Sequence, residues 1–195
     1  MYSPSRDLDI LTAMVEDLEA FIRSDVIYWQ LSDAGPFIAR NPKLTVGGLM
    51  LYRHRLAALY MSLTPEDQIT YTQLSAHLER QIVVWQANLE RKALREIHAR
   101  LGPWAWYLDD CSYRPHDCAS SYPDDVYGRT YLQLLFKVQS EDSNAVLVRA
   151  QMDQLDSQLR SMFTSGDFAW DVALEPAFPA TEFWFLHGQP SPNTC

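Results

Sequence analysis

Residues 64–101 read TPEDQITYTQLSAHLERQIVVWQANLERKALREIHARL, and this stretch decides the fold class. It opens with a threonine cap, a proline at the first helical position and two acidic residues, which together are typical of a helix start. The spacing that follows predicts one long amphipathic helix, which Gly102-Pro103 breaks or kinks. The apolar residues recur every three or four positions at Tyr71, Leu74, Leu78, Ile82, Trp85, Leu89, Ala93, Ile97 and Leu101.

The two segments that precede this stretch have the same helical spacing. Residues 7–30 carry one apolar stripe and predict an amphipathic helix, which the turn-forming residues 32–36 end. Thr45 is the natural N-cap of a second helix over residues 46–62. Because this second helix has almost no polar face, we expect it to lie at the centre of a bundle.

The second half of the chain begins with an aromatic, turn-rich connection over residues 104–122, whose conformation the sequence leaves open. Two further helices are predicted over residues 123–138 and 148–162, and Gly166 ends the second of them. Residues 167–195 then contain several aromatic residues and several prolines. We expect them to form a non-helical arm that packs on the bundle, either that of the same chain or that of a neighbouring subunit, with flexible last residues from Gln189 onward.

These patterns together predict an all-α fold, an antiparallel bundle of four to five helices in residues 1–166 with a non-helical aromatic C-terminal arm over residues 167–195. The chain has 195 residues, of which 47% are apolar and 21% charged, as in an ordinary globular domain. No disulfide or metal is needed for a chain of this length to form a core.

The charge balance disfavours nucleic acid as a partner. Asp and Glu number 25 against 16 Lys and Arg, which gives a net charge of −9. The only dense basic stretch contains Arg91, Lys92, Arg95 and Arg100. We interpret it as the C-terminal end of the long helix, where cations complement the helix dipole, in preference to a polyanion site.

The N-terminus lacks the basic start and the apolar run of a signal peptide, and no apolar stretch approaches the roughly 20 residues needed to cross a bilayer. Three cysteines are an odd number without the spacing of a disulfide framework. We therefore expect a cytoplasmic protein that does not insert into membranes.

Cys111, His116 and Cys118 lie within eight residues and are the nearest approach to a metal-ligand cluster in the sequence. A structural zinc site usually has paired short cysteine spacings and a fourth ligand, and neither is visible here. We expect an incidental loop with free thiols and no metal. A metal site and a regulatory disulfide are the alternatives.

Other catalytic and metal patterns are absent. No histidine has a carboxylate three residues before it, and no glycine-rich phosphate loop or nucleophile elbow is present. The acidic pairs Glu16 with Glu19 and Asp153 with Asp156 resemble Mg²⁺-binding pairs of helical nucleotide pyrophosphohydrolases only superficially. Glu19 and Asp156 are instead spaced as surface ion pairs with arginines four residues later. We expect no cofactor.

The triplet Arg53-His54-Arg55 interrupts the most apolar helix and is a candidate ligand contact. A buried guanidinium needs a carboxylate or a bound anion. We expect pairing with acidic residues of a neighbouring helix, and a small anionic ligand is the alternative. Trp104 and Trp106 could line such a pocket, although core packing is the preferred interpretation.

The lack of catalytic motifs, the long helices and the aromatic arm favour a non-enzymatic protein-interaction or assembly module. This hypothesis predicts self-association or another protein as partner. The alternative is a binder of a small anionic ligand, or an unrecognised enzyme, with a pocket between the helix at 46–62 and the connection at 104–122.

Overall fold

The computed structural model describes residues 2–32, 42–140 and 143–191. Most of the expected break at 32–36 and the end of the chain from residue 192 lie outside the described residues. The chain divides into two compact units, Met1–Glu96 and Ile97–Cys195. The placement of the two units relative to one another is not determined.

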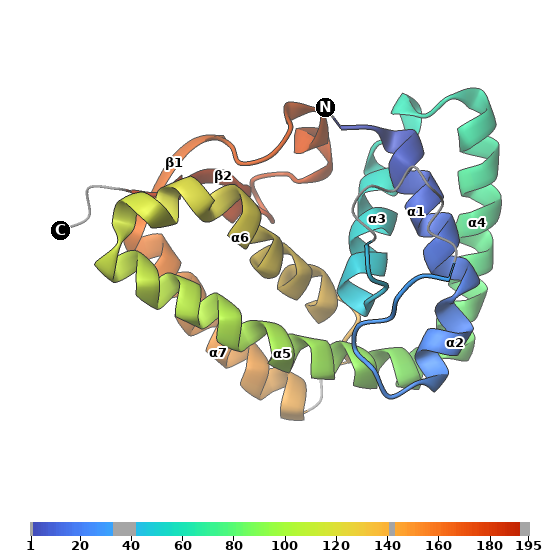
Figure 1. The fold of residues 1–195 in the computed structure, drawn as a ribbon, viewed down its shortest axis with the longest axis horizontal. Helices are drawn as coiled ribbons and strands as arrows, with labels where there is room; N and C mark the ends of the chain where they lie inside the picture. Colours follow the sequence, from blue (N-terminus) through green and yellow to red (C-terminus); the bar gives the residue numbers. More distant parts are fainter. Residues whose placement is uncertain (1, 33–41, 141–142, 192–195) are drawn as a thin grey trace. The chain divides into compact units, whose positions relative to one another are not determined.

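The first unit is helical. It contains α1 (Pro4–Glu16), α2 (Leu18–Arg23), α3 (Val46–Ala58), α4 (Pro65–Val84) and the beginning of α5 (Gln86–Tyr113). α1 lies between α3 and α4 and packs against both (Figure 1). Apolar side chains of every one of these helices form its core, among them Leu11, Met14, Leu18, Phe21, Leu49, Leu56, Leu78 and Leu89.

The expected helix starts at Thr45 and Thr64 are confirmed. The Thr45 side chain accepts a hydrogen bond from the backbone N–H of Gly48 at 2.9 Å, and Thr64 accepts one from Asp67 at 3.2 Å. Each hydroxyl thereby satisfies a backbone donor that has no partner inside its helix. These two caps fix where α3 and α4 begin.

The expectation of one helix over residues 64–101 is wrong, because the stretch forms two helices and the second extends beyond residue 101. It is interrupted at Trp85, whose backbone angles leave the helical region (φ −108°, ψ 16°), and α5 starts at the next residue. Gly102 and Pro103, expected to break or kink the helix, lie inside α5, which continues to Tyr113. Both are exposed, whereas Trp104 and Leu108 beyond them are buried. Burial of this apolar face offsets the local cost of the proline.

The second unit contains the end of α5, α6 (Pro115–Phe136) and α7 (Ser143–Met162). The connection at 104–122, whose conformation the sequence left open, is helical: α5 and α6 form a hairpin with only Arg114 between them (Figure 1). Pro123, expected at a helix start, lies inside α6.

The C-terminal arm is non-helical apart from short 3₁₀ turns, and its aromatic side chains are buried. Strands β1 (Phe163–Phe168) and β2 (His187–Pro190) pair antiparallel, so the expected free tail is wrong for Gln189 and Pro190. Phe178, Phe183 and Phe185 are fully buried. The Tyr122 hydroxyl of α6 donates a hydrogen bond to the Phe185 carbonyl, which fastens the arm to the helices of its unit.

Candidate functional site

The triplet Arg53-His54-Arg55 on α3 does not form a convergent site. Arg53 pairs with Glu79 of α4, and the buried Arg55 lies 3.8 Å from the Asp7 carboxylate of α1. The two guanidinium groups therefore reach different helices, and each has its own carboxylate partner. The expected pairing with acidic residues of neighbouring helices is confirmed.

The expected ligand-binding residues divide between the two units. Trp104 is buried and stacks on Tyr107 with ring centroids 5.3 Å apart, as core packing requires, whereas Trp106 is 67% exposed. Both lie on α5 beyond Glu96, and the Arg53 triplet lies in the first unit. Because the relative placement of the units is not determined, the pocket expected between these residues stays a prediction.

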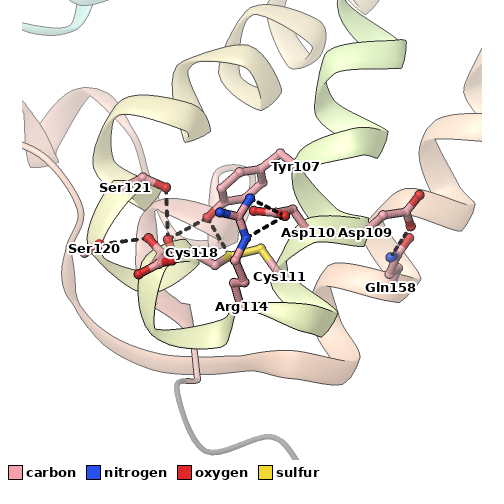
Figure 2. Close-up of a disulfide and its surroundings, with 10 residues drawn as sticks. Tyr107, Asp109, Asp110, Cys111, Arg114, Cys118, Ser120, Ser121 and Gln158 are labelled. Carbon is pink, nitrogen blue, oxygen red and sulfur yellow. Dashed lines mark hydrogen bonds and ion pairs between the residues drawn. A yellow bond between two sulfur atoms is a disulfide. The ribbon is translucent and has the colours of Figure 1, made fainter.

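Cys111 of α5 and Cys118 of α6 form a disulfide that closes the hairpin at Arg114 (Figure 2). The expectation of free thiols at these two positions is therefore wrong. With both sulfurs in a covalent bond and His116 exposed, the three residues do not form a metal site. Across residues 2–32, 42–140 and 143–191, no group of His, Cys, Asp and Glu is placed to hold a metal ion.

The surroundings of the disulfide are those of a structural bridge. The Tyr107 hydroxyl donates to the Cys118 carbonyl at 2.9 Å, and Arg114 donates two hydrogen bonds to Asp110, at 3.0 and 2.7 Å (Figure 2). Burial raises the pKa of the Tyr107 hydroxyl, so this hydroxyl stays a donor at neutral pH. Both cysteines are buried, and these contacts hold the helix ends together around them.

A pocket of about 310 Å³ in the first unit is lined by basic side chains that were expected at a helix C-terminus. We call it the basic pocket, and it is lined by Ile22, Arg23, Ser24, Asp25, Asn88, Arg91, Lys92 and Arg95. The basic stretch does not lie at a helix C-terminus, because α5 continues to Tyr113. It faces the end of α2 and the residues that follow it.

Two of these cations are held by backbone carbonyls. The Lys92 ammonium donates to the Val26 carbonyl at 2.7 Å and lies 4.2 Å from the centroid of the Phe21 ring. The Arg95 guanidinium donates to the Asp25 carbonyl at 2.7 Å. Lys92 is buried, and this burial lowers the pKa of its ammonium group, with the neighbouring Arg95 adding to the effect.

The other two cations differ in their pairing. Arg23 forms an ion pair with Glu19 at 2.6 Å, and its guanidinium lies over the Trp85 ring at 5.3 Å. Arg91 is exposed and has no hydrogen-bond or ion-pair partner within the described residues. Arg91 is therefore a cation of the basic pocket without a hydrogen-bond or ion-pair partner in the described part of the chain.

The exposed side of α4 is a second candidate for function. Of its 20 residues, only Tyr71 and Leu78 are buried. Ile69, Val83 and Val84 are 63%, 73% and 73% exposed, respectively. An amphipathic bundle helix usually carries polar residues on the side that faces water, so these side chains need an explanation.

The comparisons identify no relative. The chain matches no protein-family model, no curated protein and no solved structure. Among the described residues, none belongs to a helix that is both long enough and apolar enough to span a bilayer.

Proposed function

We propose that this chain is a non-enzymatic assembly module that self-associates through the exposed side of α4. One observation carries the proposal: α4 has apolar side chains on two opposite sides. Tyr71 and Leu78 are buried in the first unit, whereas Ile69 and Val83 are exposed. At about 100° per residue these two pairs lie on opposite sides of the helix. A helix with two apolar sides is suited to burial between partners.

The exposed apolar residues have the spacing of a helix interface. Ile69, Ala76 and Val83 follow one another at intervals of seven residues, and we call these three residues the α4 seam. A seven-residue repeat drifts by only about 20° per step around a helix, so the α4 seam forms one nearly straight line. Covering this line removes apolar surface from water, which is the main driving force of helix association.

A second copy of the chain is the partner that the α4 seam fits. In an antiparallel pair with its two-fold axis at Ala76, Ile69 of each copy would meet Val83 of the other. The small Ala76 side chain at the axis allows the two helices to approach closely. The charged residues that flank the α4 seam, Glu79 and Arg80, would meet the neutral Gln73 and Thr72, so the pairing brings no like charges together there.

Size-exclusion chromatography with multi-angle light scattering tests the proposal. We expect a dimer for the unmodified chain and a monomer for the double variant Ile69→Glu/Val83→Glu, because two carboxylates per copy would be desolvated in the interface. Val146→Glu on α7 is the matched control, since Val146 is also an exposed valine on a helix, at 58%. It should leave the dimer intact. An unmodified chain that stays monomeric up to the millimolar range contradicts the proposal.

The cytoplasmic location expected from the sequence stays a prediction. A stable disulfide is more typical of oxidising compartments, so the Cys111–Cys118 bond gives this expectation no support. Thiol labelling of the protein in intact cells, followed by denaturation, tests the location through the redox state of the two cysteines.

A further inference from the structure

We propose that the basic pocket binds the phosphate group of a small soluble molecule. Four of its lining residues are cations and one, Asp25, is an anion, although the whole chain carries a net charge of −9. Positive charge is thus concentrated at one place on a negatively charged protein. Like charges held this close repel one another, and a bound anion removes that repulsion.

The two anchored cations form their short hydrogen bonds with neutral groups. Lys92 and Arg95 donate to the carbonyls of Val26 and Asp25, which are neutral groups. These hydrogen bonds fix the two side chains in place without neutralising them. A site whose donors are already ordered loses less conformational entropy when a ligand binds.

Arg91 and Asn88 are the polar side chains of the basic pocket that are available to contact a ligand. Arg91 has no hydrogen-bond or ion-pair partner within the described residues, and the half-buried Asn88 side chain has no hydrogen-bond partner there either. One helical turn separates the two residues, so both side chains emerge on the same side of α5. A guanidinium and an amide at the same pocket offer several N–H donors to one oxyanion.

The charge of the pocket selects phosphate over a carboxylate. A phosphate monoester carries about −1.5 to −2 charges at neutral pH and three acceptor oxygens, whereas a carboxylate carries one charge. Arginine binds such groups with two parallel hydrogen bonds. A volume of about 310 Å³ lies at the lower end of small-molecule sites, which suits a phosphate with a short organic substituent.

Isothermal titration calorimetry with inorganic phosphate and with pyrophosphate, at constant ionic strength, tests the proposal. We expect saturable binding of both anions to the full chain. Arg91→Gln should weaken binding about tenfold or more, because it removes a charge-assisted contact. The variant should not lower the melting temperature, since Arg91 has no hydrogen-bond or ion-pair partner within the described residues.

Arg80→Gln is the matched control, because Arg80 is an exposed arginine on α4 that does not line the basic pocket. It should bind both anions like the unmodified chain. A parallel flotation assay compares vesicles of phosphatidylcholine alone with vesicles that also contain phosphatidic acid. We expect no enrichment on either kind of vesicle.

Three results would overturn the proposal: no saturable heat with either anion, equal affinity of the Arg91→Gln variant, or binding to phosphatidic acid vesicles without binding to the soluble anions. The outcome is independent of self-association, because the basic pocket and the α4 seam have no residue in common.

Discussion

Arg129 of α6 and Asp156 of α7 form a two-point ion pair: the Nε and Nη2 atoms of Arg129 donate to Oδ1 and Oδ2 of Asp156, each at 2.8 Å. The Arg129 side chain is 5% exposed, and its guanidinium lies 4.3 Å from the centroid of the Phe185 ring. Asp156 therefore neutralises a buried cation. The expected surface ion pair between Asp156 and Arg160 is wrong, because the Asp156 carboxylate pairs with Arg129 instead.

Asp156→Asn should destabilise the second unit by about 3 kcal/mol, since it leaves the Arg129 charge buried without its carboxylate. Asp153→Asn, three residues earlier on α7 and exposed, is the matched control and should change stability by less than about 0.5 kcal/mol. Urea denaturation of both variants measures the difference. Equal midpoints would contradict the assignment of Asp156 as the partner that Arg129 requires.

Gly188→Ala should disrupt the hairpin of β1 and β2. Gly188 has φ +147°, a region that other residues rarely adopt, and an added Cβ would lie 2.2 Å from the Thr164 carbonyl oxygen. We expect a loss of about 2 kcal/mol or more, measured by thermal denaturation. Gly166→Ala is the control on the paired strand, because the nearest atom to a Cβ there is 3.9 Å away. Equal losses for both variants would refute the role of the Gly188 backbone.

Local signals in the sequence predicted the starts of α3 and α4. Thr45 and Thr64 cap their helices through atoms three residues away, so short-range chemistry determined both boundaries. The interruption at Trp85 left no such signal, because the apolar spacing continues across it without a change. The reverse holds at Pro103, where burial of Trp104 and Leu108 offsets an unfavourable local sequence.

The sites were less predictable, because they depend on residues that are distant along the chain. The basic stretch around Arg91 was visible, but its pocket forms only when α5 meets the residues after α2. Asp25 lies 66 positions before Arg91, and no periodic pattern connects them. The Cys111–Cys118 bond depends on a helix corner at Arg114 that the cysteine spacing alone did not reveal.

Reduction of the Cys111–Cys118 disulfide should lower the free energy of unfolding by about 2 kcal/mol, because the bond closes a short loop in the unfolded chain. Thermal denaturation with and without a thiol reductant measures the change. The double variant Cys111→Ser/Cys118→Ser is the control and should not respond to reductant.

Two of the three cysteines are bonded, so denatured, unreduced protein should contain one titratable thiol. Three titratable thiols would contradict the bond.

Asp7 provides a test of buried electrostatics in the first unit. Burial raises the pKa of its carboxyl group, against the opposing effects of Arg55 and of the Tyr2 hydroxyl, which donates to it at 2.9 Å. The folded protein therefore holds the Asp7 proton more tightly than the unfolded chain does. The resulting stabilisation is fully present below the unfolded pKa of about 3.9 and is lost as pH rises through the folded pKa.

Asp7→Asn removes this titration while keeping the shape of the side chain. The variant and the unmodified chain should have similar stabilities near pH 3, where both side chains are neutral, and the variant should become the more stable of the two as pH rises toward 8. Urea denaturation across this range measures the difference. The opposite trend, in which the variant loses stability relative to the unmodified chain as pH rises, would mean that attraction to Arg55 exceeds the cost of burying the Asp7 carboxylate.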